Sequence, residues 1–258
     1  MEKKQRQYFF NVVVFDSGIG GLNLLYECAR RVPSAHYLYL SDNKNVPYGN
    51  RSPEEILSLT LAALSNIKVA CPSALVVACN TVTAHCIDEL RRIFPFPVIG
   101  IQPAVKQAAA GGKCLVLATE ATVKSSSFLS LVARYGNENT RVVPCRNLAE
   151  YVERNVTKLP PVLPEGLLPN EKADAIVLGC THYTFVKEQI KNFYNCPVFD
   201  GIAGTADHFK QIVGTADHFL TLSGICDHFY EFHPKISFIG DNSTQNRRIY
   251  KYLFGKLQ

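Results

Sequence analysis

The sequence Ala74-Leu-Val-Val-Ala-Cys79-Asn-Thr81 is a short apolar run that ends at a cysteine followed by two hydrogen-bonding side chains. About a hundred residues later, Ala175-Ile-Val-Leu-Gly-Cys180-Thr-His182 has the same construction. Short apolar runs of this kind are typical of buried parallel strands, and open α/β sheets place their sites at the carboxyl ends of such strands. The pattern therefore predicts two thiols at two equivalent strand ends.

Similar apolar runs alternate with helical patterns along most of the chain. Further strands are expected at residues 12–15, 37–40, 98–101, 114–118, 141–144, 196–199 and 236–239. Helices are expected to begin near residues 22, 53, 82, 104, 125, 148 and 183, with a polar turn at 119–122. This alternation indicates an α/β fold with mainly parallel sheets flanked by helices. Because two similar sets of elements follow each other, we predict two similar domains.

The composition fits a globular protein. Of the 258 residues 47% are hydrophobic, which is ample for a packed core in one large or two modest domains. No run approaches the roughly 18 uninterrupted apolar residues of a membrane span, and the charged start precedes too short an apolar segment for a signal peptide. We therefore expect a cytoplasmic location and no membrane partner. The net charge of +5 is mild and its basic residues are dispersed, so no nucleic-acid partner is expected.

The chain has nine cysteines, scattered without the spacing of a metal site or a close CxxC pair. No metal is expected from them. In a reducing compartment most cysteines behave as small apolar core residues. We expect this of the seven that do not follow the two strands quoted above, namely Cys28, Cys71, Cys86, Cys114, Cys145, Cys196 and Cys226.

A glycine-rich turn, Asp16-Ser17-Gly18-Ile-Gly20-Gly21, follows the first expected strand and precedes a helix. Such a turn exposes backbone N–H groups to an anion, because glycine permits close approach and the helix N-terminus favours negative charge. A dinucleotide site is disfavoured, since the GxGxxG pattern and a Walker lysine are both missing and Asp16 would repel a pyrophosphate. The alternative is an ordinary turn in which Asp16 caps the helix.

The loop after the second expected strand contains Pro47-Tyr48-Gly49. It can supply a phenol and a backbone donor to a ligand, or it can be only a turn. Ser52, with proline at the first helical position and carboxylates in the first turn, predicts a helix that starts here and runs to about Val69.

The segment Gly204-Thr-Ala-Asp-His-Phe recurs at residues 214–219 and more loosely at residues 224–229. Three Asp-His pairs suggest a metal site. A helix turns about 1000° over ten residues, however, so successive pairs would point about 80° apart. We favour a local duplication within a helical segment over a metal site.

Two thiols in equivalent settings point to a symmetric reaction. A thiolate is a competent base only where neighbouring groups favour it, and both cysteines precede helical patterns with hydroxyl, amide or imidazole side chains beside them. A cysteine hydrolase needs one such thiol. A racemase removes the Cα proton from one face and returns a proton to the other, which requires two acid/base groups. Two similar domains that close face to face would supply them.

The sequence resembles the glutamate racemases of the cofactor-independent aspartate/glutamate racemase superfamily. The resemblance rests on five motifs in the family's order: Asp16-Ser17-Gly18-Ile-Gly20-Gly21, Pro47-Tyr48-Gly49, Val77-Ala-Cys79-Asn80-Thr81, Ala121-Thr122-Val123 and Gly179-Cys180-Thr181-His182-Tyr183. It implies an active site in the interdomain cleft, with a second domain, residues 102–205, inserted into a first, residues 1–101 and 206–258. It also implies that no cofactor such as pyridoxal phosphate is used. The implied role is D-glutamate supply for bacterial peptidoglycan, and we expect a homodimer.

The resemblance also assigns site residues. Cys79 and Cys180 would be the two acid/base groups, acting on the D- and the L-enantiomer respectively. Asp16, His182 and Glu153 would assist proton transfer. The implied substrate shell consists of Asp16, Ser17, Pro47, Tyr48, Gly49, Asn80, Thr81, Thr122, Thr181 and His182. Backbone N–H groups and hydroxyls would hold both carboxylates of glutamate, while Asn80 and Asp16 would hold its ammonium group.

One departure and three alternatives stay open. Thr184 stands where the family usually has proline, a change expected to have a modest local effect. The substrate can instead be aspartate or another acidic amino acid, because one methylene changes binding by only about 1–3 kcal/mol. A non-catalytic regulatory protein with this fold is a second alternative. A cysteine hydrolase or a metal enzyme is the third.

Overall fold

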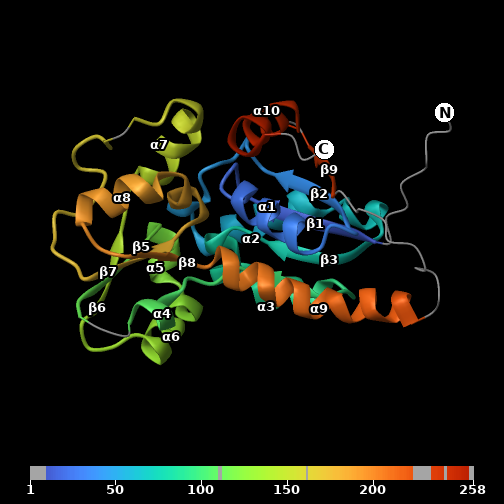
Figure 1. The fold of residues 1–258 in the computed structure, drawn as a ribbon, viewed down its shortest axis with the longest axis horizontal. Helices are drawn as coiled ribbons and strands as arrows, with labels where there is room; N and C mark the ends of the chain where they lie inside the picture. The colour runs from blue at the N-terminus through green and yellow to red at the C-terminus, as the bar shows by residue number, and fades with distance from the viewer. Residues whose placement is uncertain (1–9, 110–111, 161, 223–233, 241–242, 256–258) are drawn as a thin grey trace.

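The computed structural model describes residues 10–109, 112–160, 162–222, 234–240 and 243–255, with side chains described only up to residue 214 within the segment that ends at 222. Two parallel sheets organise these residues (Figure 1). In the first sheet the strand order is β4-β3-β1-β2-β9, and in the second it is β6-β5-β7-β8. Each neighbouring pair of strands is parallel. The predicted α/β fold with two similar domains is confirmed.

The strands match the apolar runs closely. The first sheet contains β1 (Asn11–Asp16), β2 (His36–Ser41), β3 (Pro72–Val77), β4 (Val98–Gly100) and β9 (Lys235–Ile239). The second sheet contains β5 (Cys114–Ala118), β6 (Thr140–Pro144), β7 (Ala175–Gly179) and β8 (Val198–Asp200). Strand β7 is buried along its whole length and β3 is buried from Ala74 onward, as parallel strands covered on both faces require.

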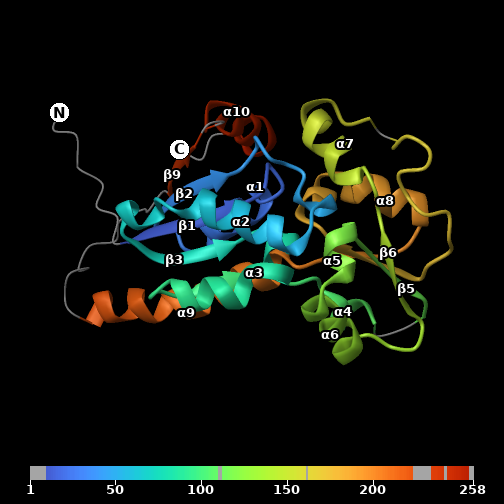
Figure 2. The same cartoon turned by 180° about the vertical axis from the view of Figure 1, so that it is seen from behind.

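Helices cover both faces of each sheet (Figures 1 and 2). The first sheet is flanked by α1 (Leu22–Arg31), α2 (Pro53–Leu64), α3 (Asn80–Ile93), α9 (Ile202–Leu222) and α10 (Ser243–Phe254). The second is flanked by α4 (Val105–Ala108), α5 (Glu120–Lys124), α6 (Ser126–Tyr135), α7 (Leu148–Asn155), η4 (Thr181–Val186) and α8 (Lys187–Tyr194). Apolar side chains from each layer form separate cores on the two faces of each sheet.

The chain crosses from the first sheet to the second after β4 and returns after β8. Helix α9 belongs to the first core, because Ile202, Ala206 and Phe209 are buried there beside α1. The two crossing segments touch, since a Cβ atom on Gly201 would collide with the backbone carbonyl of Gln102. An insertion of the second domain into the first explains this arrangement, while the exact boundaries at residues 101/102 and 205/206 stay predictions.

Several local expectations are wrong. The helix that begins at Pro53 ends at Leu64, followed by a short 3₁₀ turn, η2 (Ile67–Ala70). The predicted turn at 119–122 is the start of α5, and the helix expected from residue 183 is preceded by the 3₁₀ segment η4. The capping box at Ser52 is confirmed, because the Ser52 hydroxyl and the Glu55 carboxylate each accept a backbone N–H.

The cysteines outside the two quoted strands are mostly buried, but Cys71 is exposed and Cys196 is half-buried. Cys71 follows η2 with a left-handed backbone, which turns its side chain out of the core. Cys226 lies outside the described residues.

The ten-residue repeat lies partly within α9. Its first copy packs Ala206 and Phe209 into the core and leaves Asp207 on the surface, where it pairs with Arg31. The backbone of the second copy continues the same helix, which agrees with a duplication in a helical segment, and the third copy lies outside the described residues. Among the described residues, no three potential metal ligands gather into a group. A search of the same residues finds no helix long and apolar enough to cross a membrane.

Candidate active site

The glycine-rich turn after β1 directs a buried carboxylate toward the second domain. Asp16 is fully buried; its Oδ1 accepts the N–H of Gly18 at 2.8 Å and its Oδ2 accepts the hydroxyl of Thr181 at 3.1 Å. Burial raises the pKa of Asp16, against the opposing charge of His182. Helix α1 begins after Gly21 without a side-chain cap, so the alternative of Asp16 as a helix cap is wrong.

Cys79 ends the quoted run after β3 and is the residue just before α3. It is 5% exposed, and its Sγ lies 3.5 Å from the hydroxyl of Ser17. Burial, together with the charges of Asp16 and Cys180, raises the pKa of Cys79 to about 12, although hydrogen bonds from Ser17 and the backbone of Val82 act in the opposite direction. Cys79 is therefore a thiol at neutral pH in the ligand-free protein.

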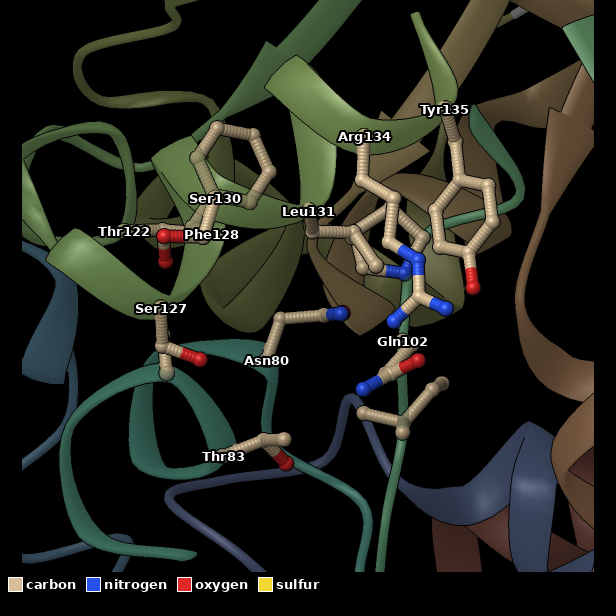
Figure 3. Close-up of a pocket in the computed structure, with 13 residues that line it drawn as sticks. Asn80, Thr83, Gln102, Thr122, Ser127, Phe128, Ser130, Leu131, Arg134 and Tyr135 are labelled. Carbon is tan, nitrogen blue, oxygen red and sulfur yellow. The ribbon is translucent and has the colours of Figure 1, made fainter. Parts of the chain in front are cut away.

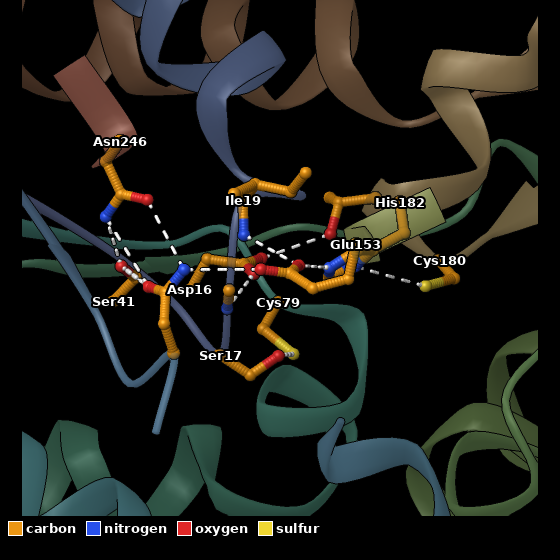
Figure 4. A network of polar contacts seen from close by, with 12 residues as sticks. Asp16, Ser17, Ile19, Ser41, Cys79, Glu153, Cys180, His182 and Asn246 are labelled. Atoms are coloured by element: carbon orange, nitrogen blue, oxygen red, sulfur yellow. Dashed lines mark hydrogen bonds and ion pairs between the residues drawn. The ribbon is translucent and has the colours of Figure 1, made fainter. Parts of the chain in front are cut away.

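Cys180 occupies the equivalent place after β7, immediately before η4. Its Sγ lies 3.9 Å from Nδ1 of His182, whose Nε2 lies 2.5 Å from Oε2 of Glu153 (Figure 4). Burial lowers the pKa of His182, but hydrogen bonds and charges from Cys180 and Glu153 outweigh burial and raise it well above 6.5. His182 therefore keeps its proton more strongly than a free imidazole, and it lies between the Cys180 thiol and the Glu153 carboxylate.

The two thiols have different environments. Cys79 has a neutral hydroxyl neighbour in Ser17 and a buried carboxylate in Asp16. Cys180 has an imidazole that a carboxylate orients. The two cysteines are near enough for the charge of Cys180 to act on Cys79. The structure thus brings together Asp16, Ser17, Cys79, Cys180, His182 and Glu153, which the sequence distributes over 167 positions from Asp16 to His182.

Two glycines of the β1–α1 turn allow the second domain to approach. A Cβ on Gly18 would collide with Oε2 of Glu153, and a Cβ on Gly20 would lie 2.6 Å from both Nδ1 of His182 and Oγ1 of Thr181. Glu153 also accepts the N–H of Ile19 at 3.1 Å. The turn is therefore glycine-rich because side chains of the other domain occupy the space beside it.

Three threonine hydroxyls form a second polar cluster, which begins two residues after Cys79. Thr81, Thr119 and Thr122 bond to one another at 2.8–3.1 Å and are all buried. Gly49 lies against this cluster, where a Cβ would be 2.6 Å from Cβ of Thr119. Asn80, at 5% exposure, begins α3 next to Cys79.

The predicted loop residues differ in their surroundings. Tyr48 is 1% exposed and its phenol donates to Oδ2 of Asp42 at 2.7 Å, so this hydroxyl already has a protein partner. Pro47 is half-buried next to it. Thr184, at the position where the resemblance expects proline, accepts a hydrogen bond from Asn23 of α1 at 2.6 Å and donates to the carbonyl of Thr181. Thr184 therefore links η4 to the first domain, which a proline side chain does not do.

Four residues of this region were not predicted. Thr119 follows β5, so the rule that polar residues gather at strand ends would have found it. Asp42 follows β2 and obeys the same rule. Asn43 and Asn246 are 203 residues apart in the sequence, and both contact the polar network of the site. No local sequence pattern predicts such a contact.

A cavity of about 280 Å³ adjoins the threonine cluster (Figure 3). Asn80 and Thr122 line it together with residues of α6 and of the crossing segment at Gln102. Arg134 and Tyr135 stand at its α6 side. Asn80 and Thr122 are the two predicted site residues that border this space between the domains, and neither Cys79 nor Cys180 lines it.

The fold and the site define a class: two-domain α/β enzymes that hold one buried thiol at a strand end in each domain. The family model for Asp/Glu/Hydantoin racemases matches residues 22–208. The chain is 38% identical over 224 residues to the glutamate racemase of Clostridium botulinum strain Alaska E43, which covers 82% of this chain and 85% of that protein. It is also 38% identical over 209 residues to the glutamate racemase of Clostridium acetobutylicum, covering 77% and 82% of the two chains.

A solved structure of a glutamate racemase is also similar to this chain. The crystal structure of Escherichia coli glutamate racemase with L-glutamate and an activator is similar over 95% of this chain and 96% of that one, with a TM-score of 0.75 and 27% identity. The chain belongs to the Asp/Glu/Hydantoin racemase family and is accordingly an isomerase.

Proposed function

We propose that this protein is a glutamate racemase that interconverts L- and D-glutamate without a cofactor, using Cys79 and Cys180 as its two acid/base groups. The observation that carries the proposal is the pair of buried thiols at corresponding strand ends of two domains, each with its own polar neighbours. The similarity to glutamate racemases over more than three quarters of the chain supports glutamate as the substrate.

The substrate would lie between the two thiols. Hydroxyls of Ser17, Thr81 and Thr122 and the backbone N–H groups near Gly49 would bind its two carboxylates, while Thr181 would hold Asp16 beside them. Asp16 and Asn80 would bind the ammonium group. An ammonium beside Asp16 also offsets the cost of a buried carboxylate, which the raised pKa of Asp16 expresses.

The proton transfers follow from the environments of the two thiols. In the ligand-free enzyme Cys79 carries its proton and Cys180 is beside His182. Cys180 as thiolate takes the Cα proton of L-glutamate, and the Cys79 thiol gives its proton to the opposite face of the same carbon. D-glutamate leaves a Cys180 thiol and a Cys79 thiolate, the form that accepts D-glutamate. Asp16 and His182 would return the two thiols to the starting form by exchange with solvent protons.

The acidity of the Cα proton must come from the site itself. Hydrogen bonds to the α-carboxylate stabilise the negative charge that develops on it, and they are strongest where water is excluded. The low exposure of Ser17, Thr81, Thr122 and Thr181 is consistent with such a dry site. In the cytoplasm of a bacterium, the D-glutamate that the enzyme makes would be used for peptidoglycan synthesis. The homodimer stays a prediction.

The test is Cα–H exchange in D₂O, followed by proton NMR, with purified protein, no added cofactor and reduced thiols. Deuterium in both glutamate enantiomers, together with their interconversion, is the expected result. Exchange into the aspartates instead of the glutamates would replace the substrate while keeping the reaction. No exchange into any of the four amino acids would contradict the proposal and favour a binding protein.

A further inference from the structure

The carboxylate of Glu153 is held from both domains. Its Oε2 faces Nε2 of His182 within its own domain and accepts the N–H of Ile19 from the first. Its Oε1 accepts a hydrogen bond from Nδ2 of Asn43, in the loop after β2, at 3.2 Å. Two of these three partners therefore belong to the first domain, and the orientation of His182 depends on them.

The amide of Asn43 has a fixed direction. The hydroxyl of Ser41 accepts a hydrogen bond from Nδ2 of Asn246 at 2.6 Å, so its own proton is directed at Oδ1 of Asn43. This leaves the NH₂ group of Asn43 for Glu153 and for Oδ1 of Asn246 at 3.4 Å. Asn246 is fully buried on α10, and Figure 4 shows it beside Ser41 at one end of the network. The three side chains satisfy one another and offer one donor to Glu153.

The packing around Glu153 explains why a polar support is present there. Val156, just after α7, is buried in the core of the first domain, so the end of α7 rests on that domain. Glu153 is only 12% exposed, and a buried carboxylate without donors would be costly. The donors from Asn43 and Ile19 hold it where its Oε2 meets His182.

We propose that Asn43, oriented by Ser41 and Asn246, is a positioning residue that fixes Glu153 across the domain interface and thereby keeps His182 directed at Cys180. This inference rests on the proposed function, because it concerns the proton transfer at Cys180. The C-terminal helix α10 thus contributes to one side of the reaction through Asn246, without touching a reacting atom.

Primary deuterium isotope effects test this role. If proton transfer at Cys180 alone becomes harder, that step limits the rate more in both directions. The isotope effect with [2-²H]L-glutamate then rises, because its deuterium moves at Cys180. With [2-²H]D-glutamate it falls, because its deuterium moves at Cys79, whose step limits the rate less. A merely structural defect does not change the two isotope effects in opposite directions.

The variant to measure is Asn43→Leu, which keeps the branching and the number of side-chain heavy atoms and removes the donor to Glu153. We expect kcat/KM to fall about tenfold in both directions, equivalent to about 1.4 kcal/mol, with the opposite isotope changes described above. The second variant, Asn43→Asp, keeps the shape of the asparagine side chain. It serves as the test if the leucine variant does not fold. It should act in the same direction, because a carboxylate cannot donate to Glu153 and repels it.

Asn155→Leu is the matched control, since Asn155 lies on the same helix as Glu153 and bonds only to the carbonyl of Tyr151 in the described network. It should leave both isotope effects unchanged. Wild-type isotope effects in both folded Asn43 variants would overturn the inference while the wild-type racemisation rate still supports the proposed function. A wild-type protein without any Cα–H exchange would instead overturn the proposed function itself.

Discussion

At the scale of single residues, the two thiols of the site have different neighbours. Burial raises the pKa of Cys79 to about 12. The Cys180 thiol instead lies next to the His182 imidazole, which in turn contacts the Glu153 carboxylate. The sequence suggested symmetry, because both cysteines follow apolar runs of the same kind. The difference arises from Glu153, which lies on another helix and reaches His182 only in the folded protein.

Removing either thiol should abolish racemisation. General acid–base catalysis typically contributes about 10²–10⁴-fold, so we expect kcat to fall by at least this factor in Cys79→Ala and Cys180→Ala, measured by circular dichroism of the amino acid. Cys86→Ala is the control, because Cys86 is a buried thiol on the core-facing side of α3. Full turnover by either active-site variant would rule out the two-thiol mechanism.

His182 should make the stability of the protein depend on pH. Its pKa is raised in the folded state, so its proton stabilises the fold fully below about pH 6.5 and loses this effect as pH rises through the raised value. The difference in unfolding free energy between wild type and His182→Gln should therefore be largest in mildly acidic buffer and shrink in alkaline buffer. Urea unfolding over a pH series measures it.

The comparison for this pH series is His208→Gln, a substitution on the exposed side of α9. A wild-type minus His182→Gln difference that grows with rising pH would contradict the raised pKa.

At the scale of secondary-structure elements, the strands were predictable and the segments at the site were less so. Buried strands such as β3 and β7 need continuous apolar runs, which are visible in the sequence. The 3₁₀ segment η4 and the short helix α5 depend on contacts with other elements, such as the bond between Asn23 and Thr184. Polar residues at strand ends could therefore be predicted to lie together, whereas the contacts of the asparagines Asn43 and Asn246 could not.

The turn between β1 and α1 should not tolerate a side chain at Gly20. In Gly20→Ala the new Cβ would be 2.6 Å from Nδ1 of His182, so η4 must shift. A misplacement of about 1 Å can cost about 10²-fold in rate, and we expect a loss of this order in kcat/KM.

The control is Gly204→Ala in α9, where nothing lies within 4 Å of the added Cβ. It should keep full activity and stabilise the protein by about 0.4–1 kcal/mol in urea unfolding, because alanine favours the helix. Equal activity of the Gly20→Ala enzyme and wild type would show that the two domains meet less closely at this turn.

At the scale of the whole molecule, the two domains are joined by two segments that touch each other at Gln102 and Gly201. The proposed catalytic groups are divided between the domains, with Cys79 and Asp16 on one and Cys180, His182 and Glu153 on the other. The relative position of the domains is therefore a condition for catalysis.

Gly201→Ala should alter this position. The added Cβ would collide with the carbonyl oxygen of Gln102, which is backbone and cannot rotate away. We expect kcat/KM to fall by about 10²-fold while the far-ultraviolet circular dichroism of the protein stays unchanged, since both sheets remain intact. An unchanged kcat/KM would mean that the crossing segments adjust without moving the domains.

Because the second domain is inserted into the first, the first domain is not completely synthesised until the second has been made. Strand β9 and helix α10 leave the ribosome only after the whole second domain, yet β9 completes the first sheet beside β2, and α10 carries Asn246. A nascent chain that has already folded its second domain still lacks one edge of the first. The enzyme would therefore gain its activity only after β9 and α10 have been synthesised, which a pulse-labelled translation assay with chains truncated before each of them can follow.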